Sequence, residues 1–549
     1  MENNNLVFKI LNSKYLIIFI LFLSICFRLI NLSTNPPGIF RDEAEKGYNA
    51  YSILKTGKYV TFEITQNGFE AQFKPFSLFI EVFGVYTPVI YHITDIPFVY
   101  LFGLNEFTTR LPSALIGILT VFFTYILVKK VYDRKCANVS ALLLAISPWY
   151  IIFSRWALQG IFVPFFIVLF LILFIKGIKI KSLYLIFSAI PLALCFYSYD
   201  ICRLLVPIFI LVIIILYHKD ILKRKTSFIL FLFLFLILIS PIILFIITNP
   251  ALAGERFNRI SIFSESKNPI KLLIIFFKNY LSHYSPMFLF IKGDEISRHS
   301  FPGLGQLNFI EFPLIILGLW QLIKKKEKFN ILLLFWFLIF PIASSLTKEG
   351  IPHSLRSIFA LPMIHIISAV GFCSLLDINL IKNQIDKKAP RNVIKKDFLI
   401  IVIILTFVTI FYLIFVVFFV YPSYSAFDWQ YGIKEALDYI NQSDKPYDGV
   451  VFSGYIVGAP YLSLYYTKYE PTTLLENGLH YTGFIYLSFG YPIKEFFIRR
   501  LKGNYFLISY PEEINYPQAE KIIYSPQNIL KQEKIKCIEI RYREGAVFN

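Results

Sequence analysis

Charged residues are scarce in this chain of 549 residues: they make up 16% of it, whereas 56% of the residues are apolar and 18% are aromatic. Soluble proteins carry about 25% charged residues and about 45–50% apolar ones. This deficit excludes an ordinary soluble protein and indicates a lipid environment. The formal net charge is nevertheless +18. A nucleic-acid-binding protein would present such a charge on one face of a soluble fold, which apolar runs of this length exclude.

Several sequence motifs are also missing. The six cysteines are scattered without a CxxC pair, which excludes a disulfide framework and a zinc module. There is no GxGxxG after a strand and no P-loop, so no nucleotide-binding site is predicted. His283, His299 and His353 show no HxH or HxxxH spacing, and the sequence therefore predicts no metal site.

Apolar runs long enough to cross about 30 Å of hydrocarbon recur over most of the chain. The first is too long for a signal peptide and lacks a small-residue cleavage site, so we interpret it as an anchor. The expected fold class is a polytopic α-helical membrane protein. About eleven membrane-spanning helices are predicted, at residues 15–33, 111–129, 137–153, 160–176, 182–199, 204–218, 228–248, 308–323, 329–345, 357–376 and 398–421.

Basic residues decide the predicted orientation. The segment from Pro88 to Phe102 is apolar but contains His92 and Asp95, and we place it along the outer membrane interface. The short cytoplasmic segments, among them residues 382–396, then hold 23 Lys and Arg residues against four in the short outer loops. This is the bias that the positive-inside rule describes. It predicts a cytoplasmic N-terminus and three outer segments, at residues 31–110, 248–307 and after residue 421.

The C-terminal segment differs in composition, since its last 129 residues carry 13 basic and 14 acidic side chains. A helix-like stretch at residues 429–441 precedes strand-like runs at 449–453, 505–509 and 535–541. The alternation predicts a small α/β domain. We therefore expect a transmembrane domain at residues 1–421 and an extracytoplasmic α/β domain at 422–549.

A carboxylate pair follows a Pro-Pro-Gly turn at the start of the first outer loop. The turn ends the first helix, and Asp42 is predicted to N-cap a short amphipathic helix. Asp42 and Glu43 have two interpretations: they cap this helix, or a carboxylate takes the proton of an attacking hydroxyl group. A second pair, Asp294 and Glu295, is predicted to form a solvated loop turn.

Arginine recurs at the outer ends of successive helices. Snorkelling to the interface explains any single one, but several on the side that disfavours them indicate a functional site. The guanidinium group suits phosphate oxygens, and a lipid-linked phosphate substrate would account for the arginines, the carboxylates and the apolar wall together. The candidate substrate ligands are Arg110, Arg155, Arg203, Arg298, His299, His353 and Arg356.

Six blocks of the sequence resemble the GT-C superfamily of glycosyltransferases, family 39 type, which includes protein O-mannosyltransferases and the lipid A aminoarabinose transferase. The blocks are PPGIFRDEAEKGYNAYSILKTG, LFGLNEFTTRLPSALIG, SPWYIIFSR, YSYDICRLLVP, FLFIKGDEISRHSFPGLGQL and LTKEGIPHSLRSIFALP. The resemblance covers about residues 15–376. It implies a polyprenyl-phosphate sugar donor, an extracytoplasmic lipid, glycan or protein acceptor, and inversion of the anomeric centre.

The resemblance also implies residue roles: Asp42 as the base, Glu43 as its positioning partner, and Arg110 as the arginine of the RLPS block. Aminoarabinose transferases carry a lysine before the proline of the juxtamembrane helix, where this chain has Thr87. Lys74, Arg203, Arg298 and Arg356 are the candidates to replace that lysine. No cofactor is predicted, although a divalent cation is left open, and the expected location is the bacterial plasma membrane.

Three other functions remain open. A lipid-linked glycan ligase or polymerase would use similar chemistry on a larger donor. A secondary transporter would need ionisable residues near the bilayer midplane and often a repeated half, whereas the predicted spans have almost no acidic residues. A membrane-anchored binding protein built on the C-terminal domain would not need eleven spans.

Overall fold

The computed structural model describes residues 9–65, 68–376, 391–488, 490–494, 503–513, 518–526 and 536–544. The basic segment 382–396 therefore lies largely outside the described residues. The chain divides into two compact units. Unit 1 comprises residues 1–30, 113–154 and 159–415, and unit 2 comprises residues 31–112, 155–158 and 416–549. The first outer loop thus belongs to the same unit as the C-terminal segment, while the domain boundary predicted at residue 421 stays a prediction.

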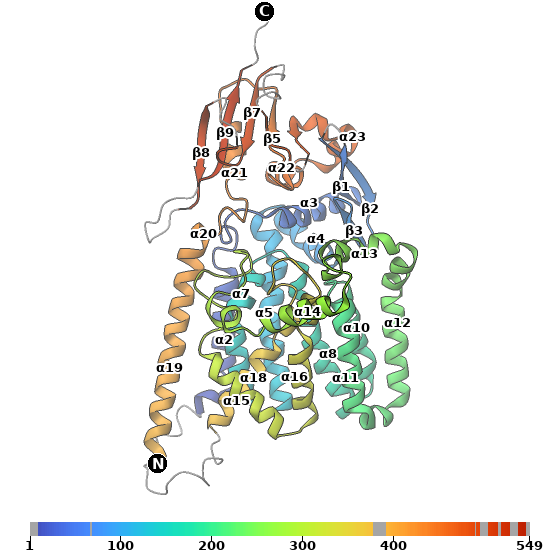
Figure 1. The fold of residues 1–549 in the computed structure, drawn as a ribbon, viewed down its shortest axis with the longest axis vertical. Coiled ribbons are helices and arrows are strands. Elements are labelled where there is room, and N and C mark those ends of the chain that lie inside the picture. The colour runs from blue at the N-terminus through green and yellow to red at the C-terminus, as the bar shows by residue number, and fades with distance from the viewer. Residues whose placement is uncertain are drawn as a thin grey trace, which may run out of the picture. The chain divides into compact units, whose positions relative to one another are not determined.

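Unit 1 is helical (Figure 1). Among the described residues of the whole chain, seven helices are long and apolar enough to cross a membrane, or eight if the bent pair α6 and α7 forms one span. Each of the eleven predicted segments contains helix, and the exact number of spans stays a prediction. The helices of this region are α2 (Leu16–Leu29), α5 (Glu106–Val131), α6 (Arg134–Ala145), α7 (Pro148–Ser154), α8 (Phe162–Lys179), α9 (Leu183–Phe187), α10 (Ala189–Phe196), α11 (Cys202–Leu222), α12 (Lys225–Thr248), α13 (Pro250–Ile260), α14 (Pro269–Ser282), α15 (Glu311–Lys324), α16 (Lys328–Ile339), α17 (Ile342–Ser345), α18 (Met363–Leu376) and α19 (Arg391–Phe415).

Small residues allow the closest helix packing in unit 1. A Cβ atom on Gly318 of α15 would lie 2.1 Å from the carbonyl oxygen of Ile367, and one on Gly371 of α18 would lie 2.0 Å from that of Leu314. Helices in membranes gain little from the hydrophobic effect and associate by such close backbone approach. Any larger side chain at either glycine would push α15 and α18 apart.

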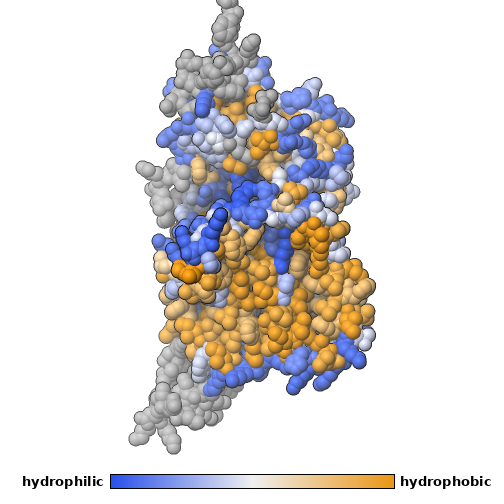
Figure 2. All heavy atoms as spheres, turned by 45° about the vertical axis from the view of Figure 1, so that its right-hand side comes forward, coloured by the Kyte–Doolittle hydropathy of each residue, from blue (hydrophilic) through white to orange (hydrophobic). Residues whose placement is uncertain are grey.

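The surface of the helices is apolar. Figure 2 shows a broad hydrophobic band across the helical face that it brings forward, with hydrophilic residues at its lower edge. Leu211, Ile215, Ile229 and Phe233, on α11 and α12, are all exposed. Such a surface requires a lipid environment, and the chain is therefore a multi-pass membrane protein.

The first part of unit 2 is built around α3 (Arg41–Thr56), which ends at the left-handed Gly57. Two antiparallel hairpins follow, β1 (Lys58–Thr65) with β2 (Gly68–Pro75) and β3 (Phe79–Val82) with β4 (Val85–Pro88). The sequence did not predict these hairpins. The segment predicted at the membrane interface forms α4 (Ile90–Phe102), whose 13 residues extend about 20 Å and are too few to cross a bilayer.

The C-terminal part of unit 2 contains a five-stranded sheet with the strand order β6-β5-β7-β9-β8. Strands β6, β5 and β7 are parallel, whereas β9 runs antiparallel to β7 and β8. The predicted helix and three strands are confirmed as α21, β5, β7 and β9. The elements are α20 (Tyr421–Tyr424), α21 (Ile433–Asn441), β5 (Gly449–Phe452), α22 (Ala459–Thr467), α23 (Pro471–Asn477), β6 (Phe484–Tyr486), β7 (Tyr505–Ser509), β8 (Ala519–Tyr524) and β9 (Lys536–Arg543).

Helix α3 and the C-terminal part share one hydrophobic core. Tyr48 of α3 is buried in the same cluster as Tyr461 and Tyr465 of α22 and Phe506 of β7. The hydroxyl group of Tyr48 donates to the carbonyl oxygen of Tyr469 at 2.9 Å. Helix α3 is thus packed on a folded domain, which positions the carboxylate pair at its N-terminus.

Candidate active site

The carboxylate pair lies in the first turn of α3. The helix begins at Arg41, and its N-cap is Phe40, in extended conformation. The predicted N-cap role of Asp42 is therefore wrong. Glu43 provides the capping interaction instead, because its Oε2 accepts a hydrogen bond from the backbone N–H of Phe40 at 3.2 Å.

Glu43 forms a fully buried ion pair with Arg110. The Nε atom of Arg110 donates to Oε1 at 3.0 Å, and its Nη2 donates to Oε2 at 2.8 Å. The backbone N–H of Ala157 also donates to Oε1, at 2.9 Å. Both carboxylate oxygens thus accept two hydrogen bonds, which makes Glu43 a structural anchor and agrees with its implied positioning role.

The remaining donors of Arg110 bind the turn before α3. Its Nη1 donates to the carbonyl oxygens of Leu32 at 3.1 Å and Pro36 at 2.8 Å, and its Nη2 also donates to that of Gly38. All five N–H donors of this guanidinium are therefore engaged within unit 2. In this arrangement Arg110 holds the Pro-Pro-Gly turn and has no donor left for a phosphate.

Asp42 differs from its neighbour in accessibility. Its side chain is 46% exposed and forms an ion pair with Arg41, the Nε–Oδ1 distance being 3.5 Å. Its backbone carbonyl accepts a hydrogen bond at 3.1 Å from the nearly buried Lys46. Asp42 is thus a solvent-accessible carboxylate in the first turn of α3.

Arg155 supports the same turn. Its Nε and Nη2 donate to the carbonyl oxygen of Asn35 at 3.1 and 2.6 Å, and its guanidinium lies over the ring of Phe418 at 5.4 Å. The side chain is 1% exposed. These contacts indicate that Arg155 stabilises the turn, and its predicted phosphate contact stays a prediction.

A buried polar cluster lies one turn further along α3, and the sequence reasoning missed it. His92 of α4 contacts Oε1 of Glu45 at 2.8 Å through Nε2, and Asn49 donates to the same oxygen at 2.9 Å. Burial disfavours the Glu45 carboxylate, but His92 and Lys46 outweigh it and lower its pKa to about 2. The i, i+4 spacing of Glu45 and Asn49 and the lone His92 in an apolar segment were the available signals.

Two of the predicted arginines line one cavity in unit 1. The cavity has a volume of about 530 Å³ and is lined by Arg203 and Arg356 together with Arg256, and by apolar residues such as Leu204 and Phe257. Arg256 was not predicted, although it is a further basic residue in an outer segment. Burial lowers the pKa of Arg356. Asp200 also lines the cavity and forms an ion pair with Arg203, the Nη2–Oδ1 distance being 3.0 Å. Three guanidinium groups against one carboxylate, beside an apolar wall, suit the head of an anionic lipid.

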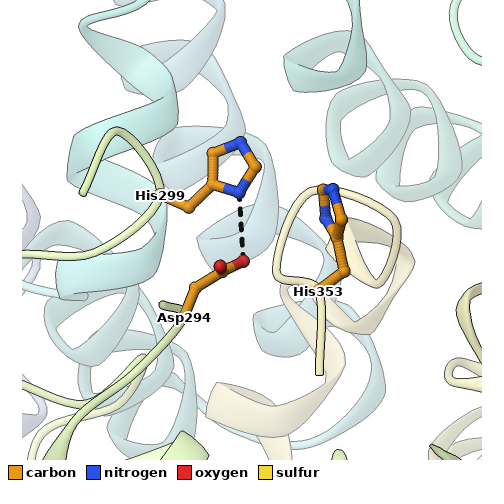
Figure 3. A group of neighbouring side chains, drawn as sticks. All are labelled: Asp294, His299 and His353. Atoms are coloured by element: carbon orange, nitrogen blue, oxygen red, sulfur yellow. Dashed lines mark hydrogen bonds and ion pairs between the residues drawn. The ribbon is translucent and has the colours of Figure 1, made fainter. Parts of the chain in front are cut away.

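Two predicted histidines meet around Asp294 (Figure 3), also in unit 1. His299 Nδ1 lies 3.0 Å from Asp294 Oδ2, and the rings of His299 and His353 are 4.8 Å apart. Asp294 is buried, whereas Glu295 is exposed. The predicted solvated turn is therefore wrong for Asp294, because His299 and Ser354 compensate its carboxylate with hydrogen bonds.

The remaining candidates are not gathered at one point. Lys74 is paired with Glu81, and Thr87 lies in the short strand β4, opposite Ile80. Arg298 is half-buried next to His299. Of the four residues proposed to replace the missing lysine, Arg203 and Arg356 share a cavity.

Comparison with known proteins agrees with this architecture. Residues 86–245 match the family described as dolichyl-phosphate-mannose-protein mannosyltransferase. The crystal structure of ArnT from Cupriavidus metallidurans in the apo state superimposes with a TM-score of 0.52 at 11% identity, covering 95% of this chain and 97% of that one. The structure of ArnT from the same organism bound to undecaprenyl phosphate superimposes with a TM-score of 0.52 at 10% identity. This match covers 96% of this chain and 98% of that one.

None of the curated proteins matches the chain. At these identities the likeness to ArnT concerns the fold. The expected resemblance is nevertheless confirmed, because a family match and a fold match point in the same direction. The chain is a polytopic membrane protein with the GT-C fold of ArnT, and it resembles the protein mannosyltransferase relatives of that superfamily.

Proposed function

We propose that the chain is an integral membrane glycosyltransferase that transfers a sugar from a polyprenyl-phosphate donor to an extracytoplasmic lipid, glycan or protein acceptor. The observation that carries the proposal is the difference between two adjacent carboxylates. Glu43 is buried and fully hydrogen-bonded, whereas Asp42 is half-exposed on the same rigid turn. Such a turn presents one available carboxylate in a defined place.

In the proposed reaction, Asp42 acts as the general base. An acceptor hydroxyl group attacks C1 of the donor sugar from the face opposite the phosphate and passes its proton to the Asp42 carboxylate. The new C1–O bond forms as the C1–O bond to the lipid phosphate breaks, which inverts the anomeric centre. A positioned base of this kind typically contributes about 10² to 10⁴-fold to the rate.

The departing phosphate gains negative charge, and prearranged cations stabilise it. Arg203, Arg256 and Arg356 are the proposed ligands, because they line one cavity that also has an apolar wall. A bound state of ArnT contains undecaprenyl phosphate, which supports a lipid phosphate as the ligand class.

The proposal is tested by replacing the proposed base, Asp42, while Glu43 is left unchanged. Asp42→Asn should abolish sugar transfer without lowering the amount of folded protein in the membrane. The matched control is Arg41→Gln, which removes the ion-pair partner of Asp42 but keeps the carboxylate, and should retain most of the activity.

The readout is mass spectrometry of envelope glycolipids, glycans and glycoproteins from cells with and without the active gene. We expect one acceptor class to gain a single sugar unit in cells with the active gene and to lack this unit in cells with Asp42→Asn. This result would also identify the acceptor. Normal transfer by Asp42→Asn would overturn the assignment of the base. A gain of whole polymer chains instead of single sugars would overturn the monosaccharide donor and favour a ligase.

A further inference from the structure

We propose that Asp294, His299 and His353 form a binding site for a divalent transition-metal ion, with zinc as the best match to the ligands. One carboxylate and two imidazoles are a common ligand set for this ion. Among the described residues, this is the only group of three or more such side chains whose ligand atoms converge. All three residues belong to unit 1.

The geometry suits a small ion. The ligand atoms lie within 4.8 Å of one another, and Figure 3 shows the two rings on the same side of the Asp294 carboxylate. Zinc–ligand bonds of about 2.0–2.2 Å place neighbouring ligands of a tetrahedral ion about 3.3–3.6 Å apart. The Oδ2–Nδ1 distance of 3.0 Å between Asp294 and His299 is close to this value, so the main adjustment is an inward movement of the His353 ring.

The carboxylate is held in place by hydrogen bonds from neighbouring groups. Ser354 donates to Asp294 Oδ2 through its backbone N–H and its hydroxyl group, both at 2.8 Å. The backbone N–H of Ile296 donates to Oδ1 at 3.0 Å. Such supporting hydrogen bonds orient metal ligands and are part of most metal sites. An ion bound here would take the place of the hydrogen bond between Asp294 Oδ2 and His299 Nδ1.

The surroundings of His353 connect this site to the arginine cavity. The backbone N–H of Arg356 donates to His353 Nδ1 at 3.3 Å, and the Arg356 side chain lines the cavity. Three protein ligands leave a coordination position open, which a phosphate oxygen can occupy. The metal site stands by itself, and only this phosphate contact rests on the proposed function.

The chain contains a matched control for the argument. His365 and Glu311 form a second buried carboxylate–imidazole pair, with Nδ1 and Oε2 at 2.7 Å, but they belong to no converging group of three in the described part of the chain. If a buried pair alone bound zinc, this pair would bind it equally well. His365→Gln should therefore leave zinc binding unchanged.

The test uses the full-length protein in detergent, purified with a tag that contains no histidine and stripped with EDTA. Calorimetric titration with zinc chloride should show one saturable site per chain, and X-ray absorption should show two imidazole nitrogens and a carboxylate oxygen at about 2.0–2.2 Å. Asp294→Asn and His353→Gln should lose this site. Absence of saturable binding to the wild type, or equal binding by both variants, would overturn the proposal.

Folding of the variants is checked by thermal unfolding in EDTA, and the measurement is repeated after EDTA is removed and zinc chloride is added. Zinc should raise the midpoint of the wild type and of His365→Gln, because a ligand that binds the folded state stabilises it. Zinc should leave the unfolding midpoints of Asp294→Asn and His353→Gln unchanged. The zinc-binding assay contains no donor or acceptor, so its result is independent of sugar transfer. Zinc binding without sugar transfer would contradict the proposed function only. Sugar transfer without zinc binding would contradict the metal site only.

Discussion

Glu43 and Arg110 meet in a doubly hydrogen-bonded pair from which solvent is excluded, with Nε–Oε1 and Nη2–Oε2 distances of 3.0 and 2.8 Å. The guanidinium also binds the carbonyl oxygens of Leu32, Pro36 and Gly38. One side chain thus ties the Pro-Pro-Gly turn to the first turn of α3. The accessible carboxylate of Asp42 is held in place by this connection.

Removal of Arg110 should destabilise the protein strongly. Arg110→Met leaves the buried Glu43 carboxylate unpaired, which typically costs about 3–5 kcal/mol. Thermal unfolding in detergent should show a large fall of the midpoint. The control is Lys434→Met, which breaks the pair with Glu106 at 3.2 Å; Lys434 is 50% exposed, and such a pair contributes about 0–1 kcal/mol. Equal midpoints for the two variants would show that the Arg110 pair does not stabilise the turn.

Loss of a cavity arginine should weaken use of the donor. A hydrogen bond to a charged group contributes about 1.5–3 kcal/mol, so Arg356→Gln should lower kcat/KM for the lipid donor about tenfold to a hundredfold. Arg259→Gln is the matched control, because Arg259 is 59% exposed and paired with Glu255 on α13. Steady-state kinetics with varied donor would measure both. An unchanged kcat/KM in Arg356→Gln would exclude a donor contact.

The Glu45–His92 contact should make stability depend on pH in the acidic range. The pKa of Glu45 is lowered to about 2 in the folded protein from its ordinary value of 4.5. The unfolded chain therefore binds more protons in this range, and stability falls as the pH falls. The stabilisation is fully present above about pH 4.5 and is lost as the pH approaches 2.

Comparison of wild type with Glu45→Gln isolates this effect. The difference between their unfolding midpoints should be largest near neutral pH and shrink on acidification below pH 4.5. A difference that stayed constant down to pH 3 would show that the charge of Glu45 does not contribute.

Asp95 should have the opposite effect. Its carboxyl group is buried, and neither oxygen has a hydrogen-bond partner in the described residues. Burial raises its pKa well above the ordinary value, so the folded protein retains a proton that the unfolded chain releases. The contribution of Asp95 to the free energy of unfolding is therefore present at low pH and is lost as the pH rises.

Asp95→Asn removes the cost of a buried charge while keeping the shape of the side chain. We expect a higher unfolding midpoint than the wild type at pH 8 and a smaller gain at pH 5. Equal gains at both pH values would mean that Asp95 does not titrate between them.

Much of the fold was predictable because lipid imposes simple requirements on sequence. The apolar runs, the juxtamembrane segment at α4 and the strands β5, β7 and β9 were predicted from length, composition and alternation. The hairpins β1–β2 and β3–β4 were missed, although VTFEIT in β1 and FEAQFK in β2 alternate apolar and polar residues. That period is typical of a half-buried strand and was the signal that could have found the first hairpin. Strands β6 and β8 were also missed; β6 has only three residues, and it pairs with β5, a strand 34 positions earlier in the chain.

The candidate site was predictable only in part. The carboxylate pair stood out beside its Pro-Pro-Gly turn, but Asp42 and Glu43 are adjacent and no local pattern separates an accessible carboxylate from a buried one. Arg110 and Arg155 looked like phosphate ligands, and the structure shows their donors bound to backbone carbonyl groups of residues 32–38.

The sequence by itself determined that the chain lies in a membrane, which segments form its helices, and which residue types are available for chemistry. Tertiary structure alone decided which of these residues meet. Asp294 and His353 are separated by 59 positions but belong to one cluster, and Arg203 and Arg356 share a cavity. The physical reason is that hydropathy and secondary structure depend on neighbours in the chain, whereas hydrogen bonds, ion pairs and metal ligation depend on distances that only packing sets.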